Sequence, residues 1–195
     1  NYWLANLTGL HELNEPLFDY LDRLVESGKT TAEKNFGMRG SVLPHATDLW
    51  APTWLRAQTA YWGVSFGEGG WMMQHYWYHY EFTNDKKFLK ERAFPAMEQI
   101  ALFYSDWLVE DPRDKTLISL PSSSPENRYI DDSGKAVALC PGSAMDQQVI
   151  LEIFTNYLEA SKILGISTAL TKKIELQRDQ LRPGFVLGKE GRILE

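Results

Sequence analysis

The most constraining feature of the sequence is a stretch rich in proline and serine, Leu120-Pro121-Ser122-Ser123-Ser124-Pro125-Glu126-Asn127-Arg128-Tyr129. Its two prolines and three consecutive serines interrupt helical and strand hydrogen bonding, so we expect neither a helix nor a central strand here. The wider span of residues 111–142 lacks helical periodicity, although strong helical patterns stand on either side. A loop this long inside a compact domain is usually functional or disordered. Apolar residues within it, such as Ile118 and Tyr129, argue against disorder.

One carboxylate, Glu126, is held in this stretch between Pro125 and Asn127. A glutamate fixed by stiff neighbours is suited to donating a proton along a set direction, as general acid catalysis requires. The alternative is a surface loop whose glutamate is merely solvated, which is the more common situation for a loop glutamate. Both interpretations stay open at this point.

Helical patterns account for most of the remaining chain. Pro16 and Pro95 are favoured first-turn residues, Ser143 is a favoured N-cap, and Gly165 is a favoured stop. We expect a helix to end at Ser27-Gly28, and a flexible entry at residues 66–70 to lead into another. The expected helices and helical turns cover residues 16–27, 31–35, 54–62, 71–82, 86–92, 95–109, 144–164 and 168–181.

Strands are expected only as short pieces. A strand over residues 116–120 is predicted to pair with 136–139, and residues 186–194 are predicted to form a hairpin around Gly191. Repeated helical pairs with long loops at one end stack into solenoids or close into a toroid. Exact repeats are absent and the helices are rich in large aromatic residues, so the pattern favours an all-α fold of the closed α/α toroid type.

Bulk properties narrow the function classes. The chain has 195 residues and 44% hydrophobic content, enough for one domain's core. A net charge of −6 without a basic run argues against nucleic acid or an anionic membrane as partner, and no apolar run is long enough to insert into a membrane. Aromatic residues at 13% suit a cleft that binds sugar rings. Because Cys140 is alone, no internal disulfide is possible. The chain begins without methionine and is expected to be part of a longer polypeptide.

A second candidate binding segment is His45-Ala46-Thr47-Asp48-Leu49-Trp50, which interleaves hydrogen-bonding groups with an aromatic face, as a sugar pocket does. Asp48 is read equally well as a local turn residue. Asp146 begins a helix, where the helix dipole alone favours an aspartate.

Two further patterns resemble ligand-binding motifs but lack residues that those motifs require. His75 and His79 have a spacing that can ligate zinc, but Tyr76 stands where a metalloprotease needs glutamate, so no metal site is expected. The glycines of residues 67–70 follow no strand and precede no Lys-Ser/Thr pair, so they predict no phosphate cradle.

Taken together, the motifs resemble glycoside hydrolase family 95. The residues that carry the resemblance are Asn1-Tyr2-Trp3, Glu15-Pro16-Leu17, Arg39-Gly40, His45, Thr47-Asp48-Leu49-Trp50, His79-Tyr80-Glu81-Phe82-Thr83, Ser124-Pro125-Glu126-Asn127 and Met145-Asp146. The Ser-Pro-Glu-Asn match is the most specific, and the resemblance covers nearly the whole chain. His45-Ala46 departs from a commoner His-Asn pairing.

The resemblance implies an inverting α-L-fucosidase, or a related α-L-galactosidase, with an (α/α)6 catalytic barrel of which residues 1–195 form about half of a single domain. It implies that Glu126 is the general acid and that His45, Thr47, Asp48, Trp50 and Asn127 bind substrate. The asparagines and aspartate that activate water in the family fall outside this sequence. The implied partner is an oligosaccharide or polysaccharide, with no cofactor and a secreted or periplasmic location.

An inverting enzyme works by single displacement, with acid and base on opposite faces of the sugar. Three rival interpretations stay open: a non-catalytic sugar-binding α/α scaffold, a phosphorylase on a related barrel, and a metalloenzyme built on His75 and His79.

Overall fold

The structure is a computed structural model that describes residues 2–54 and 59–194. It is mostly helical, and its larger helices are α2 (Glu15–Thr31), α4 (Glu68–Thr83), α6 (Phe94–Trp107), α7 (Ala144–Leu164) and α8 (Ala169–Gln180). Shorter helices are α1 (Trp3–Leu7), α3 (Ala60–Gly63) and α5 (Lys86–Phe88), together with a 3₁₀ turn at His11–Asn14 and π-helical turns at Ala32–Phe36 and Leu89–Ala93. Part of the predicted helical turn at 54–62, residues 55–58, lies outside the described residues.

The strands are short and paired two by two. The sheets join β1 (Leu108–Glu110) to β2 (Leu117–Ser119), β3 (Ser122–Ser123) to β6 (Leu139–Cys140), β4 (Tyr129–Ile130) to β5 (Ala136–Val137) and β7 (Val186–Leu187) to β8 (Ile193–Leu194). All four pairs are antiparallel. The last pair confirms the predicted C-terminal hairpin.

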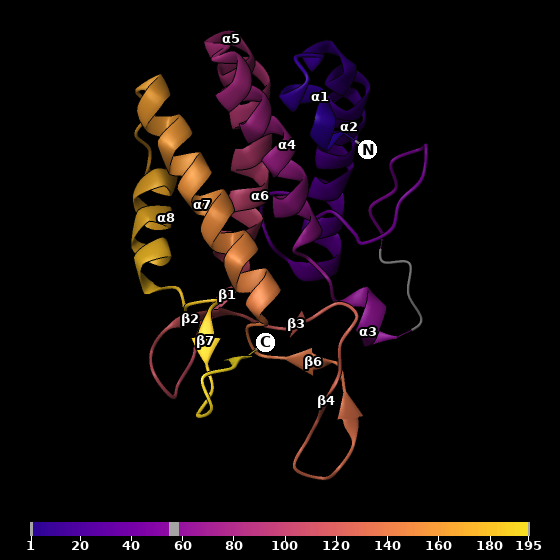
Figure 1. The fold of residues 1–195 in the computed structure, drawn as a ribbon, viewed down its shortest axis with the longest axis vertical. Helices are drawn as coiled ribbons and strands as arrows, with labels where there is room; N and C mark the ends of the chain where they lie inside the picture. Colours follow the sequence, from indigo (N-terminus) through magenta and orange to yellow (C-terminus); the bar gives the residue numbers. More distant parts are fainter. Residues whose placement is uncertain (1, 55–58, 195) are drawn as a thin grey trace.

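The helices stand side by side, with the strands and long loops gathered at one end (Figure 1). Helix α6 packs against α2, α4, α7 and α8. The side chains that fill this centre are large and fully buried, and they include Tyr76, Phe103, Tyr104, Trp107, Phe154 and Tyr157. Aromatic residues therefore build the core between the helices.

Several predicted helix ends are confirmed by their capping contacts. The Ser143 side chain accepts a hydrogen bond from the backbone N–H of Asp146 at the start of α7. Gly165 ends α7 in the left-handed conformation with φ 68°, as a C-terminal glycine should. Pro16 lies in the first turn of α2. These signals act over three or four residues, which is why sequence patterns predict them well.

The predicted end of the first long helix at Ser27-Gly28 is wrong. Helix α2 continues to Thr31 and runs through the π-helical turn to Phe36, where Gly37 provides a left-handed cap with φ 64°. Gly28 serves packing instead, because a Cβ there would lie 2.2 Å from Ser41 Oγ and 2.5 Å from the Val42 carbonyl oxygen. The missing side chain lets the following chain cross close to the helix.

The predicted flexible entry at residues 66–70 is also wrong. Helix α4 already begins at Glu68, and its glycines lie inside tight contacts between helices. A Cβ on Gly69 would lie 3.2 Å from Ile100 Cδ1 of α6, and one on Gly70 would lie 2.4 Å from Val149 Cγ1 of α7. These glycines set the spacing of α4 from its two neighbours.

The predicted pairing of residues 116–120 with 136–139 is wrong as well. Strand β2 pairs with β1, which directly follows α6, while β5 pairs with β4 and β6 with β3. The loop between α6 and α7 is thus three small antiparallel pairs rather than one hairpin. Its Leu120–Pro121 and Pro125–Glu126 peptide bonds are both cis.

Candidate active site

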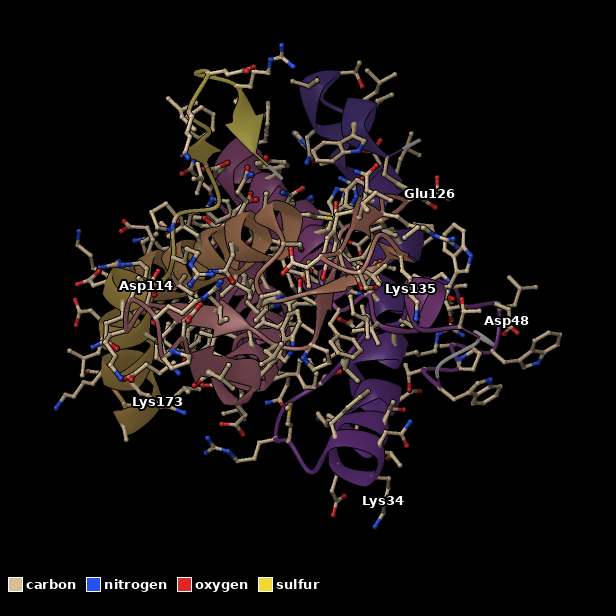
Figure 2. All side chains as sticks on the ribbon, turned by 90° about the horizontal axis from the view of Figure 1, so that it is seen from below. Lys34, Asp48, Asp114, Glu126, Lys135 and Lys173 are labelled. Carbon is tan, nitrogen blue, oxygen red and sulfur yellow. The ribbon has the colours of Figure 1, made fainter. Side chains whose placement is uncertain are left out.

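Glu126 lies in a tight turn between β3 and β4. The backbone N–H of Asn127 donates to the Ser124 carbonyl oxygen at 2.7 Å, and both Glu126 and Asn127 are exposed. Figure 2, which views the molecule from its loop end, shows the Glu126 side chain projecting from the edge. The predicted acid is accessible to a large ligand.

The strand before this turn is buried and tied to the start of α7. The Ser122 hydroxyl donates to Asp146 Oδ2 at 2.5 Å, lies 2.9 Å from Ser143 Oγ and accepts from the Ser143 backbone N–H at 3.0 Å. All three side chains are at most 2% exposed. Hydrogen bonds shielded from water in this way are costly to leave unmade. We refer to Ser122, Ser143 and Asp146 as the loop anchor.

Other tethers hold the same loop from different sides. Trp107 Nε1 of α6 donates to the Pro121 carbonyl oxygen at 3.0 Å. The Ser123 hydroxyl donates to the carbonyl oxygen of Val64, in the segment before α4. Three separate parts of the chain, α6, α7 and the segment before α4, therefore hold the run from Pro121 to Ser123.

The buried carboxyl group of the anchor has an unusual protonation equilibrium. Burial raises the pKa of Asp146 to about 7, and the nearby Glu68 carboxylate acts in the same direction, while the hydroxyls of Ser122 and Ser143 oppose the shift. Glu68 Oε1 accepts from the Ser65 hydroxyl at 2.5 Å. Within the part of the chain that the structure describes, Glu68 Oε2 is buried without a hydrogen-bond partner. Two carboxyl groups thus share a poorly solvated region between α4 and α7.

Sequence reasoning missed this role of Asp146, because it attributed the residue to the dipole of α7. The dipole and the Ser143 cap are both present, but the carboxylate also binds Ser122, 24 positions earlier in the chain. No local sequence pattern predicts such a contact. The one available indication of buried hydrogen bonding is the run of three serines, whose first two members are almost fully buried in the structure.

The second predicted binding segment, residues 45–50, is held mainly by local contacts. Asp48 Oδ1 accepts from the Trp50 backbone N–H at 2.9 Å, which closes a turn. Thr47 Oγ1 donates to the Pro52 carbonyl oxygen at 2.9 Å. The Tyr20 hydroxyl of α2 donates to the Asp48 carbonyl oxygen at 2.6 Å. The turn interpretation of Asp48 is therefore confirmed, and its sugar-binding role stays a prediction.

The two ring-bearing residues of this segment differ in exposure, because His45 is partly buried and Trp50 is exposed. His45 stacks on Trp62 at 5.9 Å between ring centroids with 30° between their planes. Trp50 is 84% exposed. In Figure 2 the side chains of Asp48 and Glu126 project at separate points on the same side of the view. The predicted acid therefore lies at the loop end, whereas the predicted platform lies beside the first half of α2, where Asp48 and Leu49 line a pocket with Leu17 and Tyr20 (Figure 1).

A pocket of about 510 Å³ lies beside the Glu126 turn. Its lining comes from the Glu126 turn, from β4 and β6, and from the residues that lead into α7, and consists of Ser124, Asn127, Arg128, Tyr129, Ala138, Cys140, Pro141 and Ser143. Asn127 is the member of this lining that the sequence predicted to bind substrate. The pocket is large enough for a sugar ring and has both apolar and hydrogen-bonding walls.

The histidine pair on α4 packs in an aromatic environment. His75 lies 5.1 Å from the Trp3 ring, and His79 lies 4.4 Å from the Phe88 ring and 5.1 Å from the Phe18 ring. In residues 2–54 and 59–194 no group of three or more His, Cys, Asp or Glu side chains is placed to hold a metal ion. Over the same residues, the helices are too short or too polar to cross a bilayer.

Two known proteins resemble this chain in sequence. It is 36% identical over 196 residues to alpha-L-fucosidase 2 of Arabidopsis thaliana and 30% identical over 203 residues to probable alpha-fucosidase A of Aspergillus niger. Both alignments cover 100% of this chain but 23% and 24% of the relatives, so the chain spans about a quarter of their length.

A solved structure shares the fold at low sequence identity. A putative kojibiose phosphorylase from the human microbiome superposes with a TM-score of 0.62 over 86% of this chain and 24% of its own, at 14% identity. At this identity the likeness concerns the fold alone.

The family model for the glycosyl hydrolase family 95 catalytic domain matches residues 1–195. With that match over the whole chain and two relatives at 30% identity or more, the chain belongs to glycosyl hydrolase family 95.

Proposed function

We propose that the protein containing this chain is an inverting glycosidase that removes terminal α-L-fucosyl residues from glycans, with Glu126 as the general acid. The observation that carries the proposal is the position of Glu126, on an exposed turn beside a sugar-sized pocket and directly after a buried, multiply tethered strand. Family membership and the fucosidase names of two relatives support the reaction class.

In the proposed reaction the Glu126 carboxylic acid gives its proton to the glycosidic oxygen as the bond to the anomeric carbon breaks. Water attacks that carbon from the opposite face of the sugar, which inverts its configuration. The group that activates the water is supplied from outside this chain. The contribution of these residues is therefore to bind the glycan and to hold the acid in the direction of the leaving oxygen.

We also propose that residues 1–195 form about half of an (α/α)6 toroid within one catalytic domain. Three observations support this: the upright helices with loops at one end, the TM-score of 0.62 to a larger solved structure, and the exposed apolar side chains of α1. Trp3, Leu4 and Leu7 are 45%, 65% and 67% exposed. Apolar patches of this kind mark surfaces that another part of a protein covers.

Fucose is the preferred sugar in this proposal because both relatives carry fucosidase names and because the pocket wall includes Tyr129, Ala138 and Pro141. L-Galactose adds one hydroxyl to L-fucose, and an apolar wall rejects an added hydroxyl by only about a hundredfold. Comparing an aryl α-L-fucoside with an aryl α-L-galactoside on the full-length protein tests the choice. A clear preference for the galactoside would reverse it.

The acid is tested with Glu126→Gln in the full-length protein. This change keeps the shape of the side chain but removes the proton, so we expect turnover of a natural oligosaccharide to fall by about 10²–10⁴-fold. A nitrophenyl glycoside needs little protonation of its leaving group, so it should lose much less.

The matched control is Glu190→Gln, an exposed glutamate at the tip of the β7–β8 hairpin. This substitution should leave the turnover of both substrates unchanged. Near-normal turnover of the oligosaccharide by Glu126→Gln would remove Glu126 from the mechanism and favour the solvated-loop interpretation.

A further inference from the structure

Asp146 is a buried carboxyl group to which the proposed reaction gives no task. It is 1% exposed, and it lies on the first turn of α7. Burying a carboxyl group costs free energy unless its partners compensate, so its contacts indicate what it does. Those contacts lead to the loop as well as to the cap of its own helix.

We propose that Asp146 is a positioning residue that sets the direction of Glu126 by holding Ser122. This inference rests on the proposed function and adds to it a part of the chain that touches no substrate. Asp146 Oδ2 accepts the Ser122 hydroxyl at 2.5 Å, and the backbone N–H of Ser123 also donates to the Asp146 carboxylate. One carboxylate therefore holds two successive residues of β3.

The connection from this anchor to the acid is short. Four positions separate Ser122 from Glu126, and the turn between them is closed by the hydrogen bond from Asn127 to Ser124. On its other edge β3 pairs with β6, with Ser122 opposite Cys140 and Ser123 opposite Leu139. Because the turn is exposed and its base is buried, the place of β3 determines where the turn points.

Helix capping alone does not explain the arrangement. The Ser143 side chain already caps α7, and an aspartate serving only the dipole would not need to be buried. The start of α4 also leaves room for the Asp146 carboxylate. Gly67 lies at the start of α4, and a Cβ on it would come within 2.9 Å of Asp146 Oδ1. Two helices and one strand thus meet at this side chain.

The experiment is a double-variant cycle in the full-length enzyme with Asp146→Asn and Glu126→Gln. Both substrates, the natural oligosaccharide and the nitrophenyl glycoside, are measured for kcat and KM separately. Misplacing a reacting group by about 1 Å can cost about 10²-fold in rate. We expect Asp146→Asn to lower kcat on the oligosaccharide by about 10- to 100-fold, with a much smaller loss on the nitrophenyl glycoside and little change in KM.

The double variant separates positioning from general destabilisation. If Asp146 acts through Glu126, adding Asp146→Asn to Glu126→Gln should cost less than about threefold, because residues that act as a unit are strongly non-additive. Equal losses on both substrates, or losses that multiply in the double variant, would overturn the positioning role.

Two further variants guard against a folding defect. Ser122→Ala removes one hydroxyl and no carboxyl group, and it should reproduce the leaving-group dependence of Asp146→Asn; it repeats the test if Asp146→Asn folds poorly. Ser161→Ala is the matched control, because its buried hydroxyl bonds the Tyr157 carbonyl oxygen on the same helix far from the loop. It should preserve the rate ratio between the two substrates.

The same data distinguish the two proposals from each other. Unchanged oligosaccharide turnover in Glu126→Gln would overturn the proposed acid. A strong, leaving-group-dependent loss in Glu126→Gln together with multiplying losses from Asp146→Asn would overturn only the role of Asp146.

Discussion

The two segments that the sequence marks for the site are held in opposite ways. Residues 45–50 close a turn with their own backbone, and they reach α2 through Tyr20 and α3 through the ring contact of His45 with Trp62. The strand Ser122–Ser123 is almost fully buried and is tied to α7 and to the segment before α4, and Pro121 just before it is tied to α6. Both segments nevertheless lead to an exposed side chain. The first ends at Trp50, and the second is followed three positions later by Glu126.

This difference indicates which task each segment suits in the proposed reaction. A platform that a sugar stacks on tolerates small displacements, because stacking depends weakly on exact position. A proton donor must meet one oxygen atom along one direction, so the backbone that carries it must be held in place. The buried strand β3 holds the turn of Glu126 in this way, and residues 45–50 have no such buried support.

The largest effect is expected from the tryptophan under the Glu126 loop. Trp107 is 1% exposed, packs 5.2 Å from the Phe66 ring and bonds the Pro121 carbonyl oxygen. Trp107→Ala should lower the free energy of unfolding by about 3–5 kcal/mol. Trp50→Ala, which truncates an exposed ring, should change it by no more than about 0.5 kcal/mol.

Urea unfolding of the full-length protein measures both tryptophan variants. Although Trp50→Ala should barely change stability, it should raise the KM for the glycan if the ring is a sugar platform. Similar stability losses in the two variants would show that the two segments are held alike.

A smaller effect concerns pH. The pKa of Asp146 is raised to about 7 by burial, above its value near 4 in the unfolded chain. Between these values the folded protein keeps a proton that the unfolded chain releases, so this contribution is complete below about pH 4 and is lost as the pH rises to about 7. Asp146→Asn should remove this component, so the difference in stability between wild type and variant should shrink over that window and stay flat above it.

The control for this pH profile is Asp106. The Arg39 guanidinium lowers the pKa of Asp106 to about 2, so its stabilising contribution is present above about pH 4 and is lost as the pH falls towards 2. The difference profile for Asp106→Asn should therefore slope in the opposite direction, at lower pH. A flat profile for Asp146→Asn between pH 4 and 7 would contradict the assigned environment of Asp146.

The smallest effect is expected at the contact that holds residues 45–50. Tyr20→Phe removes the hydroxyl that bonds the Asp48 carbonyl oxygen and lies 3.1 Å from Thr47 Oγ1. It should cost about 0.5–1.5 kcal/mol of unfolding free energy and speed hydrogen exchange locally. The ratio of rates on the oligosaccharide and the nitrophenyl glycoside should not change. A change in that ratio would show that this segment, too, directs the proton.

Sequence patterns predicted the features of the fold that are set over a few residues. The Ser143 cap, the Gly165 stop, most helix positions and the C-terminal hairpin are confirmed. The patterns failed where a glycine serves packing between helices. Gly28, Gly69 and Gly70 look like breaks or hinges in one dimension, but each makes room for a neighbouring element.

The candidate site shows the same division. The serine, proline and asparagine residues around Glu126 marked the loop as non-helical, and the structure places it at the loop end of the helices. The partners of Ser122 could not be predicted, because α7 begins more than twenty positions later and burial depends on how α4 and α7 approach each other. The catalytic and substrate-binding roles and the secreted or periplasmic location stay predictions.

One feature of the loop bears on how such enzymes diversify. The tip of the β4–β5 hairpin is closed by its own hydrogen bonds: the Asp131 carboxylate accepts from the backbone N–H groups of Ser133 and Lys135, and a Cβ on Gly134 would meet nothing within 4 Å. The hairpin base contributes Tyr129 to the pocket, and the loop anchor reaches the same pocket through Ser143. In the proposed reaction, insertions or deletions at residues 131–135 would alter how far the wall at Tyr129 extends over a bound glycan, while the contacts of the loop anchor with β3 stay in place. Substrate range and proton delivery would then vary separately within a single loop.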